Sequence, residues 1–259
     1  MWKIIKTRFQ QGYRTSAYPD GPSALPERFR GRPVVSSQPC AQGCSACADS
    51  CPTQAIAFAE DRRVRLDLGK CIFCTECITA CPEGAISYST DHRMAARSRE
   101  DLILSGEEAR LAHALDEKTR KLFGRSLKLR EVCAGSCNGC EAELTALNNV
   151  VFDLSRFGIQ FVASPRHADA LVVTGPVTDH MRGALRAAYD AMPTPKLVIA
   201  VGACAVSGGP FAGSPQAHDG ADSTVPVDLY IPGCPPHPLT ILDGILRLLG
   251  RLEGGRERV

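Results

Sequence analysis

The sequence lacks the usual marks of a secreted, membrane-spanning or nucleic-acid-binding protein. Its 259 residues contain no run of about 18 apolar residues, so we expect no transmembrane span of its own. Residues 1–12 carry Lys3, Lys6 and Arg8 but no apolar core or cleavage site, so we expect no secretory signal. The formal net charge is only +2, which gives no indication of nucleic acid as a partner.

Cysteine, in contrast, is abundant, with 13 in the chain. Such a number indicates either a secreted disulfide framework or metal ligation. The count is odd, and most of the cysteines fall into tight C-x-x-C pairs. Disulfides are rare in a reducing cytosol, which is where a chain without a secretory signal is expected. We therefore predict a metalloprotein.

The N-terminal region, residues 1–39, is predicted to be a helix followed by an extended docking arm. A helix near the start would place Trp2, Ile5 and Phe9 on one face and basic residues on the others. This pattern is typical of a helix on a membrane surface or a partner subunit, and equally of a terminal helix packed on its own domain. Residues 12–39 are rich in Pro, Gly, Ser and Arg, which indicates the extended arm.

Residues 40–90 contain an internal repeat of cysteine-rich loops, each ending in Cys-Pro. The second loop, from Cys71 to Pro82, reads C-x2-C-x2-C-x3-C-P. Three thiolates at this spacing can reach different irons of one [4Fe–4S] cluster, and the fourth reaches the other cluster in two-cluster proteins. A zinc ribbon is the alternative, although zinc needs only two pairs of ligands.

The first loop of the repeat departs from this spacing. Cys44, Cys47 and Cys51 keep it, but three residues instead of two separate Cys40 from Cys44. We expect a one-residue bulge that still lets Cys40 bind a cluster. Otherwise this cluster has a non-protein ligand or contains only three irons.

After the repeat, the sequence changes character twice. Residues 91–128 lack cysteine and are rich in charge, and we predict a charged linker helix there. Residues 129–259 alternate between apolar strands and helices. The predicted strands are 159–162, 170–174, 197–201 and 227–231, and the predicted helices lie near 139–153, 179–192 and 237–251. This alternation predicts an α/β domain with a parallel sheet.

Four cysteines of the α/β domain are predicted to form a third site: Cys137, Cys140, Cys204 and Cys234. The last two each follow an apolar strand, and the first two precede a helix. Ligands of open α/β sheets bind beyond the carboxyl ends of the strands, so the four thiolates can converge there. For Cys137 and Cys140 alone, a thioredoxin-like redox pair is the alternative. The remaining Cys133 is predicted to be a buried or free thiol.

Residues 129–252 resemble the small subunit of membrane-bound [NiFe] hydrogenases of the formate hydrogenlyase type. The matching segments are Gly-Ser-Cys-Asn-Gly-Cys-Glu (135–141), Ala-Asp-Ala-Leu-Val-Val-Thr-Gly-Pro-Val-Thr (168–178), Val-Gly-Ala-Cys (201–204) and Tyr-Ile-Pro-Gly-Cys-Pro-Pro (230–236). The cluster-carrying subunit of respiratory complex I shares this domain, but it has two adjacent cysteines where hydrogenases have a spaced pair. The spacing of Cys137 and Cys140 therefore favours a hydrogenase. His237 stands where these subunits often have Arg.

Residues 1–90 resemble the two-cluster ferredoxin subunit that accompanies both families, so the chain looks like a fusion. The resemblance implies a flavodoxin-like α/β parallel-sheet domain after a small α+β ferredoxin domain of the bacterial 2[4Fe–4S] type. It also implies three [4Fe–4S] clusters. Their ligands would be Cys40, Cys44, Cys47 and Cys81 in the first, Cys71, Cys74, Cys77 and Cys51 in the second, and Cys137, Cys140, Cys204 and Cys234 in the third.

The function implied by the resemblance is that of an electron-transfer subunit on the cytoplasmic face of a membrane. It would connect an electron donor or acceptor protein with the nickel–iron site of a partner large subunit, beside membrane subunits of the same complex. No catalytic residue is expected in this chain. The alternatives are the equivalent subunit of a complex I-like quinone reductase and a stand-alone multi-cluster electron carrier. Glu141 and Glu143 are either proton relays or solvated or helix-capping carboxylates.

Overall fold

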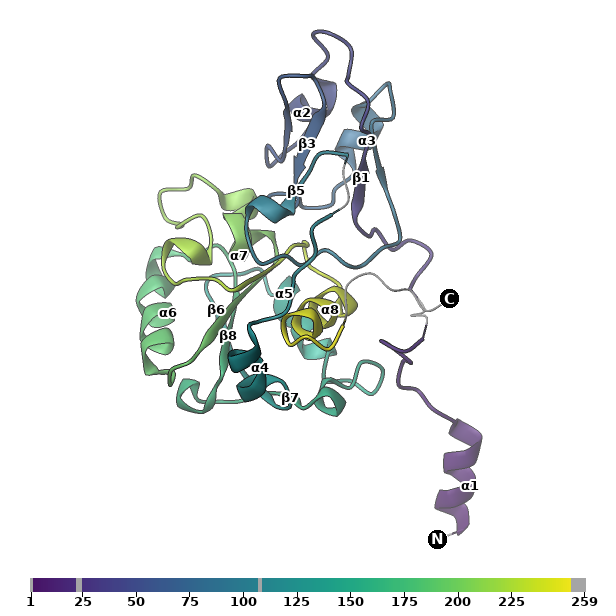
Figure 1. Ribbon diagram of the computed structural model, residues 1–259, viewed down its shortest axis with the longest axis vertical. Coiled ribbons are helices and arrows are strands. Elements are labelled where there is room, and N and C mark those ends of the chain that lie inside the picture. The colour runs from purple at the N-terminus through teal and green to yellow at the C-terminus, as the bar shows by residue number, and fades with distance from the viewer. Residues whose placement is uncertain (1, 22–24, 107–108, 253–259) are drawn as a thin grey trace.

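A five-stranded parallel sheet organises the larger part of the computed structural model, which describes residues 2–21, 25–106 and 109–252 (Figure 1). Its strands lie in the order β10-β9-β8-β6-β7, and all neighbours run parallel. Their bounds are β6 (Leu127–Cys133), β7 (Ile159–Phe161), β8 (Ala170–Thr174), β9 (Leu197–Val201) and β10 (Leu229–Ile231). The first strand lies between the second and the third, which is the flavodoxin order, and the expected flavodoxin-like sheet is confirmed.

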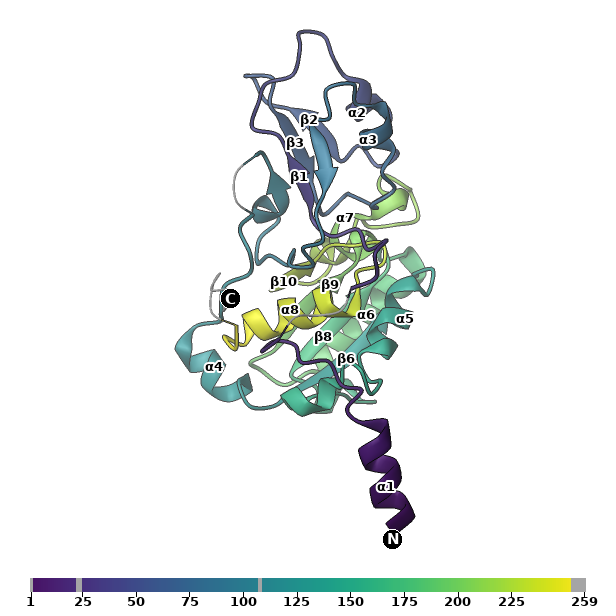
Figure 2. The same cartoon turned by 90° about the vertical axis from the view of Figure 1, so that its right-hand side faces the viewer.

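Helices cover both faces of this sheet (Figures 1 and 2). One face carries α6 (Asp179–Ala191) and α7 (Ala203–Ser207), and the other carries α5 (Gly139–Ala146) and α8 (Pro238–Leu248). Strands β8 and β9 are buried along their whole length, as expected of strands covered on both faces. Four 3-10 turns complete the connections: Leu154–Phe157, Pro165–His167, Gly209–Phe211 and Ala221–Ser223.

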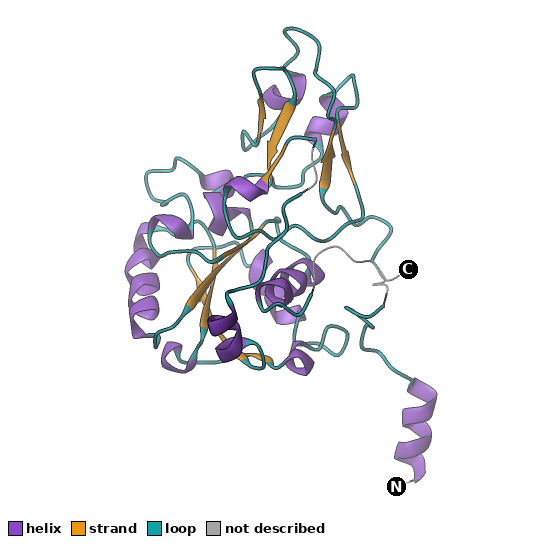
Figure 3. Cartoon of the chain, in the orientation of Figure 1, coloured by secondary structure: helices purple, strands orange, loops and turns teal. Residues whose placement is uncertain are grey.

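The ferredoxin part consists of two small antiparallel sheets and two short helices. One sheet contains β2 (Ile56–Phe58), β3 (Val64–Asp67) and β5 (Ile103–Leu104), and the other contains β1 (Pro33–Val35) and β4 (Ile86–Tyr88). The helices are α2 (Ala46–Asp49) and α3 (Glu76–Ala80), which pack on each other. Loops make up most of this part, as Figure 3 shows. The expected small α+β domain is confirmed.

The predicted linker helix over residues 91–128 is wrong for most of its length. Apart from the 3-10 turn Glu100–Leu102, the described residues of this segment are helical only in α4 (Glu117–Phe123). Strand β5 instead joins the ferredoxin sheet, because Leu104 is apolar, lies opposite Leu66 and becomes buried there. The predicted arm also takes part in the sheets, since β1 pairs with β4.

The ferredoxin part and the α/β part share a hydrophobic core. One continuous cluster of buried side chains runs from Leu66 and Ile86 to Val173 and Val206 on the α6/α7 face of the large sheet. At the junction, the buried Ser207 Oγ donates a hydrogen bond of 2.7 Å to the Gly69 carbonyl. An ion pair of 2.9 Å joins Arg99 to Asp67 beside it. The two parts are therefore packed against each other.

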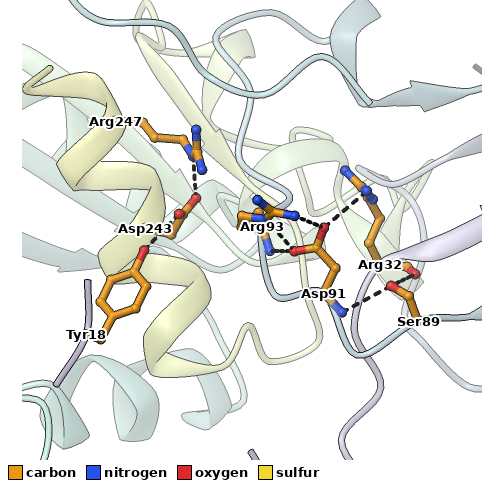
Figure 4. A network of polar contacts seen from close by, with 7 residues as sticks. All are labelled: Tyr18, Arg32, Ser89, Asp91, Arg93, Asp243 and Arg247. Atoms are coloured by element: carbon orange, nitrogen blue, oxygen red, sulfur yellow. Dashed lines mark hydrogen bonds and ion pairs between the residues drawn. The ribbon is translucent and has the colours of Figure 1, made fainter. Parts of the chain in front are cut away.

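A buried polar network anchors the N-terminal arm to the α/β part (Figure 4). The Tyr18 hydroxyl donates to Asp243 Oδ1 at 2.8 Å, and Arg247 Nε donates to Asp243 Oδ2 at 2.8 Å. Nearby, Asp91 accepts from Arg93 and pairs with Arg32 at 3.1 Å. Tyr18 therefore links the arm to α8, and Arg32 links the arm to the segment that follows β4.

Helix α1 (Trp2–Gln11) extends away from the rest of the molecule (Figures 1 and 2). None of its residues is buried, and Trp2 and Phe9 are each 84% exposed. Within the described ranges, no helix combines the length and the apolar character needed to span a bilayer.

Candidate iron–sulfur sites

The eight cysteines of the ferredoxin part fall into two groups. In the first group, burial raises the pKa of Cys40, and the nearby thiolates of Cys44 and Cys81 raise it further. Burial raises the pKa of Cys47 to about 11, and the thiolates of Cys81 and Cys40 contribute. These four cysteines are the predicted first set, including Cys40 despite its longer spacing.

The second group surrounds a small apolar cavity in the ferredoxin part. Four thiols line this cavity together with Ile56, Leu66 and Tyr88, and they are those of Cys51, Cys71, Cys74 and Cys77. Burial raises the pKa of Cys77 to about 11, and the thiolates of the other three add to it. The predicted second set is thus brought together.

Backbone N–H groups point at several of these sulfur atoms. Ala55 donates to Cys51 Sγ at 3.2 Å, Phe73 to Cys71 Sγ at 3.4 Å, and Ala85 to Cys81 Sγ at 3.3 Å. Hydrogen bonds of this kind favour the thiolate over the thiol. A sulfur that accepts a backbone N–H is therefore prepared to act as a metal ligand.

The third group lies beyond the carboxyl ends of β6, β9 and β10, beside the topological switch point of the sheet. Burial raises the pKa of Cys204 to about 11, and the thiolates of Cys234 and Cys137 contribute to the rise. Burial also raises the pKa of Cys140, and Glu141 and the other three thiolates of the group add to the rise. All four predicted ligands of the third site are therefore neighbours.

Local backbone geometry makes room for these thiols. Gly202 follows β9 with a φ of +89°, and a Cβ on it would lie 2.5 Å from Cys140 Sγ. Only glycine fits this conformation and this contact. Asn138, the N-cap of α5, has a φ of +69° and turns the chain between Cys137 and Cys140. The spaced pair is thus presented by a left-handed turn at the start of a helix.

The donor sets fit iron–sulfur clusters in chemistry. Each group collects four thiols and includes one, Cys47, Cys77 or Cys140, whose pKa is raised by burial and by neighbouring thiolates, and such a set is stabilised when a cationic metal core binds the thiolates. Across the described residues, no three His, Cys, Asp or Glu side chains are arranged around the position of a single metal ion. A four-iron cluster takes each thiolate on a different iron, so this finding concerns mononuclear sites alone.

Comparison with known proteins identifies the family. Residues 137–248 match the family model described as NADH ubiquinone oxidoreductase, 20 Kd subunit, and residues 40–85 match that of a 4Fe-4S dicluster domain. The probable membrane-bound hydrogenase subunit mbhJ of Pyrococcus furiosus is 46% identical over 132 residues, which are 51% of this chain and 79% of that protein. The chain belongs to this hydrogenase and complex I-like family. It is an iron–sulfur electron-transfer subunit of an oxidoreductase.

Two further relatives mark the breadth of the family. Formate hydrogenlyase subunit 7 of Escherichia coli is 48% identical over 133 residues, which are 51% of this chain and 52% of that protein. An NADH-quinone oxidoreductase subunit of Clostridium beijerinckii is 48% identical over 119 residues, 46% of this chain and 70% of that protein. The chain thus spans about half the length of the formate hydrogenlyase relative.

The acidic residues after Cys140 have different surroundings. Glu141 accepts hydrogen bonds from Ser136 and from Thr174 Oγ1, the latter at 2.5 Å. Burial opposes ionisation of Glu141, but these two hydroxyl donors outweigh it and hold its pKa below the usual value. Burial alone raises the pKa of Glu143. Glu141 is therefore a hydrogen-bonded anion beside the third group and not a solvated carboxylate.

The remaining predictions concern single residues. Cys133 is exposed at the end of β6, with its Sγ 3.7 Å from Ser136 Oγ. His237 is the N-cap of α8, and its Nδ1 accepts the Leu239 N–H at 3.2 Å. Ser207, whose hydroxyl donates a hydrogen bond from the α/β part to the ferredoxin part, was not predicted, because a lone serine gives no signal of burial.

Proposed function

We propose that this family member carries three [4Fe–4S] clusters and transfers electrons between a redox partner protein and the nickel–iron site of a large hydrogenase subunit. The twelve cysteines of the three groups would hold the clusters. The observation that supports this most strongly is the close connection between the second and third groups. It would allow the three clusters to act in series.

The connection lies at the junction of the two parts. Gly69, two residues before Cys71, accepts the hydrogen bond from Ser207. Ser207 closes the short helix α7, whose second residue is Cys204. A single buried contact therefore ties the loop of the second group to the helix of the third. The first and second groups are also connected, because each takes its fourth cysteine from the other loop: Cys81 belongs to the first group and Cys51 to the second.

The chain's own residues would keep the clusters apart from water and in fixed positions. Leu66, Ile56 and Tyr88 wall the second group, and β9 and β10 fix Cys204 and Cys234 at adjacent strand ends. When bound, clusters of this type accept and release one electron at a potential that charge and hydrogen bonds to sulfur adjust. The N–H groups of Ala55, Phe73 and Ala85 would supply such hydrogen bonds.

The hydrogenase branch is favoured by the pair Cys137 and Cys140. The two cysteines are separated by Asn138 and Gly139, whereas complex I, by the resemblance described above, has an adjacent pair. Residue Asn138 is held in the left-handed region to make this spacing possible. The equivalent subunit of a quinone reductase is the second candidate, and it is supported by the similar identity to the NADH-quinone oxidoreductase relative of Clostridium beijerinckii.

Helix α1 supports association with the cytoplasmic face of a membrane. It presents Trp2, Ile4 and Phe9 to solvent, and its basic residues Lys3 and Lys6 suit anionic lipid head groups. The Tyr18–Asp243 hydrogen bond would hold the following arm to the body of the subunit. Membrane subunits of the same complex would lie on this side.

The proposal is tested by anaerobic purification of the native complex through a tag on this chain. We expect about twelve irons per copy, which three four-iron clusters require, together with nickel and hydrogen-dependent dye reduction. The same iron without nickel or hydrogen activity would contradict the hydrogenase assignment. Co-purifying membrane subunits would then indicate the quinone reductase, and their absence a stand-alone carrier. About eight irons per copy would contradict the count of three clusters.

A further inference from the structure

Arg62 contacts the lengthened loop of the first cysteine group through both its side chain and its backbone. Its Nη2 donates to the carbonyls of Ala41 at 3.2 Å and of Cys44 at 2.5 Å. Its own carbonyl accepts the Cys40 N–H at 3.0 Å. One residue therefore fixes the first cysteine of the loop, the inserted segment and the second cysteine.

The backbone of Arg62 is held in a conformation that favours glycine. It lies in the turn between β2 and β3, where its N–H donates to the Ala59 carbonyl at 3.0 Å, and its φ is +65°. Hairpin loops with this geometry usually have glycine at the left-handed position. An arginine here carries backbone strain, which indicates that its side chain serves a purpose.

The guanidinium of Arg62 is also positioned beside the thiols. It stacks over the Phe58 ring at 4.5 Å from the centroid, and this contact fixes its plane. Its hydrogen bond to the Cys44 carbonyl places it beside the first cysteine group. In the described part of the chain its Nε is buried and has no hydrogen-bond partner. A buried donor of this kind suits an anionic sulfur cluster.

We infer that Arg62 is a positioning residue that makes Cys40 a ligand of the first cluster despite the extra residue, and that its charge raises the reduction potential of that cluster. The inference rests on the proposed function, because it requires a cluster at the first group. The carbonyl contacts hold the loop closed, and the guanidinium stabilises the more negative, reduced state. The lengthened spacing and the strained arginine thus compensate each other.

The test uses the tagged full-length chain in its complex, with three variants. Arg62→Gly removes the side chain and places glycine at the left-handed position of the turn. Turn strain therefore cannot prevent this variant from folding. Arg62→Lys keeps the charge but cannot donate to two carbonyls from a planar fork. Arg65→Gln is the matched control, because Arg65 lies on the exposed side of β3 and its loss changes the net charge equally. Iron content, the electron paramagnetic resonance of three-iron clusters and the midpoint potentials are measured.

For Arg62→Gly we expect an about tenfold loss of electron affinity at the first cluster, about 59 mV for one electron, and partial conversion to a three-iron cluster. Arg62→Lys should show the conversion with a smaller potential shift, and Arg65→Gln neither. An Arg62→Gly variant with the wild-type potential and only four-iron signals would overturn this inference alone. A wild-type chain without a first cluster would overturn the proposed function and this inference with it.

Discussion

The buried carboxylate of Asp243 should be the most sensitive polar group of the α/β part. It is 1% exposed and accepts hydrogen bonds from Tyr18 and from Arg247, which is 6% exposed. Replacing it by asparagine preserves the shape but leaves the Arg247 cation buried without its counter-charge. We expect Asp243→Asn to be strongly destabilising.

The magnitude follows from the burial of both partners. Removing one member of a buried ion pair costs about 3–5 kcal/mol of unfolding free energy, because the other charge stays desolvated. For a domain of this size, each kcal/mol lowers the midpoint of thermal unfolding by about 2–4 °C. The expected drop is therefore about 6–20 °C. Tyr18→Phe removes one hydrogen bond to a charged acceptor and should cost about 1.5–3 kcal/mol.

The assay is thermal unfolding of the purified chain under argon, followed by far-ultraviolet circular dichroism, because the one tryptophan, Trp2, lies on the exposed helix α1 and does not report on the α/β part. Loss of clusters makes such unfolding irreversible, so all variants are compared at one scan rate and one concentration. The matched control is Asp243→Asn combined with Arg247→Met. It removes both charges and should recover part of the lost stability, because an uncharged pair has no desolvated cation.

Two results would refute this reasoning. An Asp243→Asn midpoint within about 2 °C of the wild type would mean a cost near 1 kcal/mol or less, below that of a buried ion pair. A double variant less stable than Asp243→Asn would mean that Arg247 is not left uncompensated in the single variant. The anchoring of the arm would then depend on other contacts.

Four further outcomes are expected. Replacing Trp2 and Phe9 together by glutamate should move the chain from the pellet to the supernatant when it is sedimented with anionic lipid vesicles, because the apolar face of α1 is lost. Ser207→Ala leaves a buried carbonyl unpaired and should cost about 1–3 kcal/mol in the same thermal assay. Burial lowers the pKa of His92, so the folded protein keeps this side chain neutral at pH values where the unfolded chain protonates it. The contribution of His92 to stability is therefore complete above the unfolded pKa of about 6.5 and is lost as the pH falls through the lower folded pKa. The midpoint temperature of the wild type should therefore decrease as the pH is lowered from about 7.5 to about 5.5, and that of His92→Gln should decrease less. Cys204→Ser should lower the iron content by about four atoms per chain, while the two ferredoxin clusters keep their spectra.

The parallel sheet could be predicted where its strands are almost entirely apolar. Segments 170–174 and 197–201 have the predicted bounds in the structure, because their only polar residue, Thr174, stands at a strand end and leaves the apolar pattern intact. The inner strand β6, which lies between β8 and β7, was missed. Its residues Lys128, Arg130 and Glu131 interrupt the apolar pattern, although Leu127 and Leu129 are completely buried. Charged side chains at a strand's less buried positions hide it from a pattern search.

The cysteine groups could be predicted from spacing and resemblance, but the residues that support them could not. The position of Arg62 depends on a turn whose left-handed residue is usually glycine, and no local motif marks an arginine there. The linker helix was wrong because Leu104 finds a partner in Leu66, 38 positions earlier in the sequence. Pairing between distant strands depends on tertiary contacts and overrides a local charge pattern.

The junction at Ser207 has a consequence for assembly. The ferredoxin part and the α/β part lie on one polypeptide, and the two family models match separate stretches of it, residues 40–85 and 137–248. Because linked modules meet at a high effective concentration, the two parts need no encounter between separate chains. The stoichiometry of the two parts is fixed at one to one from synthesis. A junction built from a shared core and a few hydrogen bonds, such as that from Ser207 to Gly69, is then sufficient, since it has only to orient two parts of one polypeptide.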